Sequence, residues 1–352
     1  MQTLFKNLFN LMRLLKLSPF VISIKILHLP SVKCASRYQK INFSTTPAFS
    51  RFYYLKEQKG IALVVTLLAL VLITAMVVEF SYGVYTGTNN LYNWRDSQRL
   101  SIMAKSGINV SAKFLTSLPM DRPYPGSIEF PVENPFEDFS GTITVRIEDE
   151  SSKFNVKSLV PGNGIVDEND EKSPYNSFRR LLNVLSLDER IADRIVDWID
   201  SNSEARIPNS EVGAKNSALN SVDELLLING ISRKDYDTLL PYITIYGNRD
   251  APEININSAE EPVLKSLSKY ITGDDAKRII KYRESNPFRG KSDLMSVLGF
   301  TGSKGQSLMN KITTDIGPNF SIKSIAASGG VKRIIETVFN ASTRTIEYWK
   351  EY

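Results

Sequence analysis

The residues best suited to chemistry lie in the stretch DWIDSNSE, residues 197–204. Asp197 and Asp200 are three positions apart on an expected helix, so their carboxylates share one face. An acid–base pair of this kind needs a companion, and the sequence offers no nearby His, Cys, Ser–Lys pair or Gly-rich phosphate loop. The sequence therefore indicates no enzyme, and it leaves two interpretations of this stretch open: a solvated helix end or a cation site.

The cation interpretation rests on hard oxygen ligands in a loop that follows a helix, which is what calcium requires. The candidate ligands are Asp200, Asn202, Glu204 and Glu211. A second acidic loop, DENDEK at 167–172, begins like an EF-hand loop but lacks the central Gly and the later Glu. We expect that second loop to be solvated.

The composition of the chain excludes several other kinds of site. His28 and Cys34 are the only His and Cys, so residues 61–352 contain neither. Disulfides, thiolate or His metal sites and His-based triads are thereby excluded from that region. Its 33 Lys and Arg stand against 37 Asp and Glu, so the basic character of the whole chain belongs to its first 60 residues.

A single apolar run, residues 61–78, is 18 residues long and contains no charge. At about 1.5 Å per residue a helix of this length covers roughly 27 Å, close to the hydrocarbon core of a bilayer. A buried core helix would show a polar face, and a cleaved secretory signal would be shorter. Lys56 and Lys59 precede the run and Glu79 follows it, which predicts a cytoplasmic N-terminus and a body outside.

The residues around Gly60 have the layout of a prepilin-type signal, in which a peptidase cuts before the apolar helix and the helix stays on the mature protein. Cleavage would fall between Gly60 and Ile61. Such signals usually carry Glu at the fifth mature position, where this chain has Val65. Residues 1–54 are long for a leader, and we expect translation to start at Leu55 instead.

The rest of the chain predicts a mixture of helices and strands. Ile143, Val145 and Ile147 alternate in a half-buried strand, and three further strands are expected after residue 315 around Gly329 and Gly330. Between them lie amphipathic helices, including helix–turn–helix stretches in 221–243 and 291–312. Ser258 has the character of an N-cap for a helix that follows it.

The order of these features resembles the GspK family, the K-type minor pseudopilins of bacterial type II secretion. The matching phrases are KGIALV, EDESSKFNV, DWID, SVDELLLINGI, EININSA and ITGDDAKRIIKYRESNPFRGKSDLMSVLG. They extend over residues 59–352. The apolar residue Val65 in place of the usual Glu is itself typical of this branch of pilin-like proteins.

The resemblance implies an α+β fold with a long N-terminal transmembrane helix, a pilin-like domain of helix plus antiparallel sheet, and a large, mainly α-helical insert of two SAM-like units. The expected parts are a leader at 1–60, the N-terminal helix at 61–118 with its membrane span at 61–78, the pilin-like domain at 119–157 and 316–352, and the helical units at 158–250 and 251–315.

The resemblance also implies a function without catalysis. A minor pseudopilin of this kind caps the tip of the secretion pseudopilus and helps to initiate its assembly, with other minor pseudopilins, the major pseudopilin, prepilin peptidase and the inner membrane as partners. The body would lie in the periplasm, and the family's helical insert binds calcium.

A membrane-anchored DNA-binding protein is the alternative, because the helix–turn–helix stretches resemble helix-hairpin-helix modules. Such modules need positive charge to bind phosphates. Residues 219–310 contain 12 Lys and Arg and 12 Asp and Glu, so their net charge is zero. We therefore expect no nucleic-acid partner.

Overall fold

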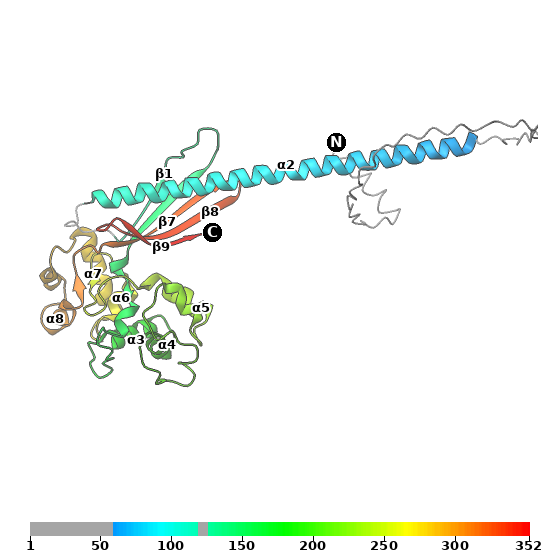
Figure 1. The fold of residues 1–352 in the computed structure, drawn as a ribbon. Helices are drawn as coiled ribbons and strands as arrows, with labels where there is room; N and C mark the ends of the chain where they lie inside the picture. The colour runs from blue at the N-terminus through cyan, green and yellow to red at the C-terminus, as the bar shows by residue number, and fades with distance from the viewer. Residues whose placement is uncertain (1–58, 119–125) are drawn as a thin grey trace, which may run out of the picture. The chain divides into compact units, whose positions relative to one another are not determined.

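The computed structural model describes residues 59–118 and 126–352, and the expected leader therefore lies outside the described part. The chain divides into two units, Met1–Leu72 and Ile73–Tyr352. The described part of the first unit is the opening of helix α2, which runs from Lys59 to Ser117. The second unit contains the remainder of α2, a sheet and all the shorter helices (Figure 1).

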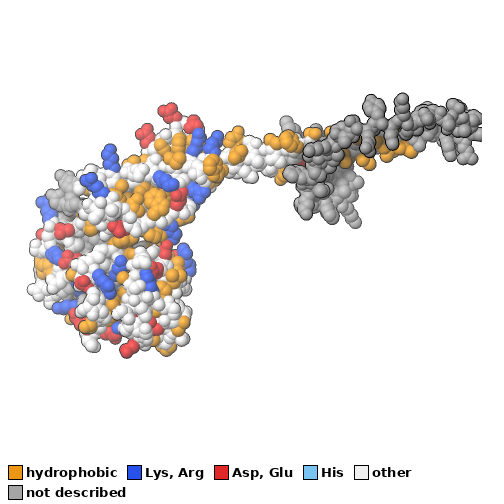
Figure 2. Space-filling model, in the orientation of Figure 1, with side chains coloured by type: hydrophobic (Ala, Val, Ile, Leu, Met, Phe, Trp, Pro, Cys, Tyr) orange, Lys and Arg blue, Asp and Glu red, His pale blue; other side chains and the backbone are white. Residues whose placement is uncertain are grey.

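Helix α2 changes character along its length. Apolar side chains between Ile61 and Trp94 are largely exposed (Figure 2). Further along, one face is buried against the sheet, as helical periodicity predicts. The fully buried apolar residues of this face are Leu100, Met103, Ala104, Ile108 and Leu115. Gly107 permits the closest approach, because a Cβ at that position would lie 2.2 Å from Ser324 Oγ.

The sheet is antiparallel, with strand order β1-β2-β7-β8-β9. Its strands are β1 (Ser127–Val132), β2 (Thr142–Asp149), β7 (Asn319–Ser328), β8 (Val331–Asn340) and β9 (Thr345–Glu351). The predicted alternation of Ile143, Val145 and Ile147 is confirmed, since all three are buried. Strand β1 is an addition to the sequence prediction, and it is an edge strand that contains Pro131.

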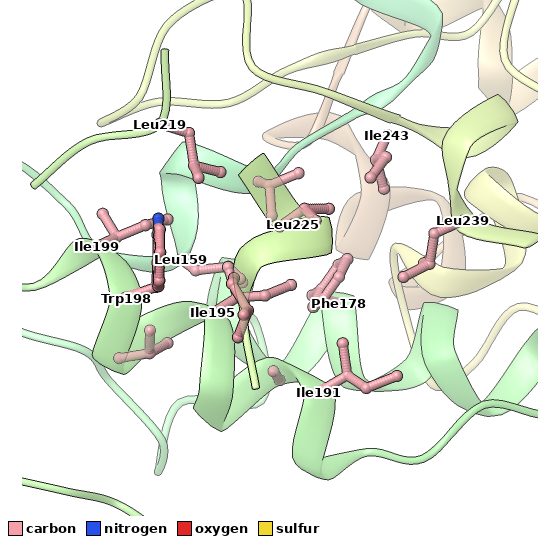
Figure 3. Close-up of a cluster of buried hydrophobic side chains, with 14 of the residues drawn as sticks. Leu159, Phe178, Ile191, Ile195, Trp198, Ile199, Leu219, Leu225, Leu239 and Ile243 are labelled. Carbon is pink, nitrogen blue, oxygen red and sulfur yellow. The ribbon is translucent and has the colours of Figure 1, made fainter. Parts of the chain in front are cut away.

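A first helical unit follows β2 and has its own hydrophobic core (Figure 3). Its elements are η1 (Glu150–Ser152), β3 (Phe154–Asn155), η2 (Val156–Leu159), α3 (Pro174–Val184), α4 (Arg190–Ile199), η3 (Val222–Leu227), α5 (Arg233–Leu239), η4 (Leu240–Tyr242) and β4 (Ile243–Thr244). Phe178 from α3, Ile195 from α4 and Leu225 from η3 converge in the core.

A second helical unit follows, also with a separate core. Its elements are β5 (Ile254–Asn255), α6 (Glu261–Ser266), α7 (Gly273–Ser285), η5 (Lys291–Ser296), α8 (Ser303–Met309) and β6 (Ile312–Thr313). The two units repeat one plan: β3 pairs in parallel with β4, and β5 pairs in parallel with β6. In each, an Asn side chain at the end of the first short strand accepts the N–H two residues on, at Lys157 and Asn257.

Two details of the sequence prediction are wrong. The N-cap of α6 is Glu260, and Ser258 instead donates its hydroxyl to the buried carboxylate of Asp149 at 3.0 Å. A buried carboxylate needs such donors, which outweighs the capping preference of Ser. The first helices of both helix–turn–helix stretches are 3₁₀ turns, η3 and η5, not α-helices. The fold as a whole is the predicted α+β mixture.

Polar side chains join the helical units to the sheet. Asp149, at the end of β2, accepts the side-chain amide of Asn255 at 2.8 Å and thereby binds the second unit. Asp223, in η3 of the first unit, accepts Tyr348 Oη and Lys350 Nζ of β9, each at 3.0 Å. Both units are therefore held to the sheet through buried or half-buried carboxylates.

Candidate functional site

The candidate site lies at the C-terminal end of α4. This helix is strongly amphipathic and buries Ile191, Ile195 and Trp198 in the core of the first unit. Asp197 and Asp200, at the C-terminal end of the helix, are also buried, with exposed fractions of 0% and 5%. The interpretation as a solvated helix end is therefore wrong. Ionised groups are not buried without compensation, so these carboxylates need partners.

Residues 200–221 form the loop that covers this end of α4. The loop turns back on itself at Asn209, Gly213 and Asn216, because all three have positive φ angles. The loop also binds α4 directly. The backbone N–H of Arg206 donates to Asp197 Oδ2 at 2.9 Å, and the hydroxyl of Ser210 donates to the same oxygen.

Four oxygens in this pocket are buried without any hydrogen bond. Within residues 59–118 and 126–352, six side-chain N or O atoms in total are buried without a hydrogen bond, and these four are two-thirds of them. The four are Asp197 Oδ1, Asp200 Oδ1, Glu211 Oε1 and Asn216 Oδ1. Unsatisfied buried acceptors are costly, so four together are suited to a positively charged or hydrogen-bonding partner, either a cation or ordered water.

The electrostatics of the pocket agree with this reading of the geometry. Burial, and secondly the charge of Asp197, raise the pKa of Asp200. Burial and the charges of Asp197 and Asp200 likewise raise the pKa of Glu211. Both shifts mean that the carboxylates repel one another and lack solvation, which a bound cation would relieve.

The structure brings together two of the four ligands that the sequence suggests. Asp200 and Glu211 contribute unpartnered oxygens to the pocket. Asn202 is used locally: its amide donates to Asp200 Oδ2 at 2.9 Å, and its oxygen accepts the N–H of Glu204 at 2.7 Å. The Glu204 side chain is exposed to solvent.

Sequence reasoning missed two residues with unpartnered oxygens at this place, Asp197 and Asn216. The signal for Asp197 was present, because its spacing of three from Asp200 places the two carboxylates on one face of an expected helix. Asn216 gave no signal, since its place in the pocket depends on the path of residues 200–221. The side-chain amide of Asn216 donates to the carbonyl of Asn202 at 3.0 Å, and its oxygen is buried without a partner.

The donor set suits a hard cation such as calcium, which takes carboxylate and amide oxygens. The pocket is loose, however. In the described ranges, no three Asp, Glu, His or Cys side chains are drawn together as tightly as a bound metal ion requires. The residues therefore fit calcium by chemistry and by their unpartnered oxygens, and binding would require the loop to close on the ion.

The second acidic loop, 167–172, is exposed, as the sequence predicts. Asp167 and Asp170 use side-chain oxygens to accept backbone N–H groups within the loop. Glu168 is different, because its carboxylate binds the guanidinium of Arg206 from the loop that covers α4.

The predicted processing site lies at the start of α2. Gly60, Ile61 and Val65 are all in its first two turns and exposed. Within the described residues one helix, Gly60–Ser117, is long and apolar enough to cross a membrane by length and composition. The cleavage itself involves the leader, which the described ranges do not include.

Comparisons with known proteins point to one family. A family model for protein K of the type II secretion system matches residues 152–248, and a second model with the same description matches 254–315. These segments correspond to the two helical units. Three curated proteins called type II secretion system protein K are also similar.

The relative from Pseudomonas aeruginosa is 33% identical over 189 residues, which are 48% of this chain and 53% of the relative. That from Aeromonas hydrophila is 28% identical over 236 residues, 60% of this chain and 68% of the relative. The relative from Dickeya chrysanthemi is 25% identical over 312 residues, which are 74% of this chain and 88% of the relative. The chain thus spans about half the length of the Pseudomonas relative.

A solved structure shares the fold. It is the crystal structure of the GspK-GspI-GspJ complex from the type 2 secretion system of enterotoxigenic Escherichia coli, in which one chain matches with a TM-score of 0.58. The match covers 75% of this chain and 99% of that chain, at 15% sequence identity.

Proposed function

Because the chain belongs to the protein K family of bacterial type II secretion systems, we propose that it is a minor pseudopilin that caps the tip of the pseudopilus. In this role it helps to initiate assembly of the filament for protein export across the outer membrane. It acts as a structural subunit and performs no catalysis.

The observation that carries the proposal is the two-part character of α2. The helix is 59 residues long without a break, exposes an uncharged apolar surface from Ile61 to Val78, and buries a second face against the sheet from Leu100 onward. The first part is suited to the inner membrane and to the filament core, and the second fixes it to a folded body. The N-terminus would then be cytoplasmic and the body periplasmic.

Val65 supports a place at the end of the filament. The Glu usual at this position in pilin-like proteins is thought to pair with the N-terminal amine of the subunit ahead. An unpaired carboxylate inside a membrane is destabilising by roughly several kcal/mol, as membrane-insertion scales measure it. A subunit with no neighbour ahead has no amine to offer, so an apolar residue is favoured there.

The position of the helical units supports the same place. Both units lie in the chain between β2 and β7, which are neighbouring strands of the sheet. The sheet is therefore complete without them, and they add bulk to one subunit of the assembly. Bulk of this size would obstruct a subunit stacked above it but not at an open end.

Partners follow from the family. The solved relative is in a complex with GspI and GspJ. For this chain we propose the corresponding small minor pseudopilins as neighbours, with the major pseudopilin below them and prepilin peptidase as the enzyme that cleaves between Gly60 and Ile61.

We propose calcium as the ligand of the pocket at the end of α4. The ligands would be the four unpartnered oxygens of Asp197, Asp200, Glu211 and Asn216, with Asn202 and Glu204 shaping the loop. The ion would neutralise carboxylates that the chain itself leaves unpaired, and it would hold residues 200–221 against α4.

The DNA-binding alternative is disfavoured because arginine side chains of the chain itself lie against the turns that would bind a phosphate. In the first helical unit Arg194 Nη1 donates to the carbonyl of Asn229 at 2.8 Å, and its guanidinium lies beneath Gly230. In the second, Arg278 lies in the same relation to Gly299. A helix-hairpin-helix module instead leaves this turn open for a phosphate.

Processing provides the first test. Protein purified from membranes should begin at Ile61, as determined by N-terminal sequencing, and Gly60→Leu should accumulate the uncleaved form. Gly83→Leu, a matched change at an exposed glycine of the same helix, should leave processing unchanged. A mature protein that begins before residue 50 or after Val78 would contradict the pilin-type interpretation.

The tip position needs a separate measurement. Photo-crosslinkers at exposed positions of α2, such as Tyr85 or Tyr92, should capture minor pseudopilins and little major pseudopilin. Gold labels on the body should mark one end of each filament. Labels at regular intervals along the shaft would contradict the tip assignment and leave the family membership untouched.

A further inference from the structure

Arg206 lies among three carboxylates that come from two other segments of the first helical unit. Its guanidinium binds Glu168 in the second acidic loop, and it is 3.7 Å from Asp197 Oδ1 and 3.9 Å from Asp193 Oδ1 on α4. The side chain is 22% exposed and lies over the ring of Tyr175, 5.7 Å from its centroid. It is therefore a half-buried cation at the rim of the carboxylate pocket.

Arg206 compensates the pocket only in part. Its approach to Asp197 Oδ1 is too long for a hydrogen bond, and that oxygen remains unpartnered. The oxygens of Asp200 and Glu211 remain unpartnered as well. The other nearby cation of the loop, Lys215, is engaged elsewhere, because it donates to both oxygens of Glu224 at 3.0 Å.

We propose that Arg206 is a tethered counter-ion that competes with a divalent cation for this pocket and so sets its affinity. This inference rests on the proposed calcium site. Without the ion, the guanidinium offsets part of the charge of Asp197. With the ion bound, it keeps its contact with Glu168, which already binds it. The second acidic loop then has a function without being a metal site: it holds the guanidinium at the edge of the pocket.

The size of the effect follows from Coulomb's law. Even with the dielectric constant of bulk water, one positive charge about 6 Å from a divalent ion changes the affinity for that ion about tenfold. Partial burial of the pocket increases the effect. Competition of this kind keeps the site responsive to changes in calcium concentration instead of permanently filled.

The test is isothermal titration of calcium chloride into the full-length mature protein in detergent, with four variants. Arg206→Gln should bind calcium at least about tenfold more tightly than the wild type. Arg206→Lys keeps the charge, and its affinity for calcium should stay closer to that of the wild type than that of Arg206→Gln does. Glu168→Gln removes the carboxylate that holds the guanidinium of Arg206 at the edge of the pocket, and it should weaken calcium binding. Arg233→Gln, at an exposed arginine paired with Asp237 on α5, is the control and should change nothing.

A second readout separates competition from simple support of the fold. In EDTA, Arg206→Gln should lower the melting temperature, and saturating calcium should remove that deficit. Arg206→Gln binding no more tightly than a wild type that does bind calcium would overturn the inference and leave the calcium site standing. If neither protein binds calcium, the pocket is not a cation site and both proposals fall.

Discussion

The two helical units follow one plan, but they treat a buried carboxylate in opposite ways. Residues 192–202 read ADRIVDWIDSN and residues 276–286 read AKRIIKYRESN, so α4 and α7 are corresponding helices. Asp197 and Asp200 correspond to Lys281 and Glu284, which are both exposed. The chain then returns to a 3₁₀ turn through residues 200–221 in the first unit and through only 286–290 in the second.

The buried carboxylate of the second unit is Asp275, at the start of α7. It forms a capping box with Thr272, accepts Lys304 Nζ at 2.9 Å and pairs with Arg278. Burial alone would raise its pKa, but the hydrogen bonds from Lys304 and Thr272 hold that pKa well below its usual range. Every charge that Asp275 needs is supplied by the chain.

The first unit lacks such a set of internal cations. Arg206 acts on Asp197 and on Asp200 but on neither fully, and Asp197, Asp200 and Glu211 each keep an unpartnered oxygen. The difference teaches how to distinguish the two cases: a buried carboxylate that its own chain neutralises supports the fold, whereas one that its chain leaves unpaired is where we propose an external ion. The longer loop of the first unit is what brings those unpaired oxygens together.

The largest expected effect comes from removing the internally neutralised charge. Asp275→Asn should lower the free energy of unfolding by about 3 kcal/mol, at the low end for a broken ion pair because Arg278 and Lys304 are partly exposed. Asp197→Asn in EDTA should cost under about 1 kcal/mol, since it relieves repulsion in the pocket. Urea unfolding of both variants, with exposed Asp274→Asn as the control, measures this contrast.

Equal costs for Asp275→Asn and Asp197→Asn in EDTA would break the comparison, because both carboxylates would then be structural. If only Asp197→Asn lowered the free energy of unfolding, the comparison would be reversed, because Asp197 would then be the structural carboxylate.

A smaller effect concerns the contact between the units. Lys311, from the second unit, donates to Ser177 Oγ of α3 at 2.9 Å and to the carbonyl of Leu267 at 2.7 Å. Burial, together with the nearby Arg180, lowers its pKa from 10.5 to about 8. Between these two pH values the unfolded chain holds a proton that the folded chain has released, so stability from this group rises with pH.

Thermal unfolding from pH 7.5 to 9.5 measures the contribution of Lys311. The wild type should gain stability relative to Lys311→Met across this range, by less than about 1 kcal/mol over the first pH unit. The wild type should show no such gain relative to Lys304→Met, which replaces a lysine that is paired with an acid. A wild type that loses stability relative to Lys311→Met as pH rises would mean that Lys311 keeps its proton in the folded state.

Much of the fold was accessible from the sequence because local patterns determine it. The uncharged run from Ile61 predicts the opening of α2, and the alternation from Ile143 to Ile147 predicts β2. Strand β1 escaped because it is only six residues long and contains Pro131, which argues against a strand, although its residues alternate in burial. Ser258 was misassigned because its partner, Asp149, is distant in the sequence and becomes a neighbour only in the folded chain.

The candidate site was half accessible for the same reason. Asp200 lies next to a helix end, and Glu211 lies on the same loop, so residue type and proximity suffice for both. Asn216 reaches the pocket only through the positive φ angles at Asn209, Gly213 and Asn216 itself, which sequence spacing does not reveal. Arg206 attracts no attention in the sequence, because its three acidic partners come from two other segments of the chain.

The claim at the centre of this comparison is that the first helical unit takes an external cation where the second uses its own side chains. Thermal unfolding of the full-length mature protein with and without calcium tests it most directly. Calcium at ten times its Kd should stabilise the wild type by about 1.4 kcal/mol, because a ligand that binds only the folded state shifts the equilibrium by RT ln(1 + [L]/Kd). The double variant Asp200→Asn, Glu211→Gln should lose that gain, and Glu284→Gln, at the position in α7 that corresponds to Asp200, should keep it. A wild type whose melting temperature does not respond to millimolar calcium, or a gain that survives in the double variant, would contradict the claim.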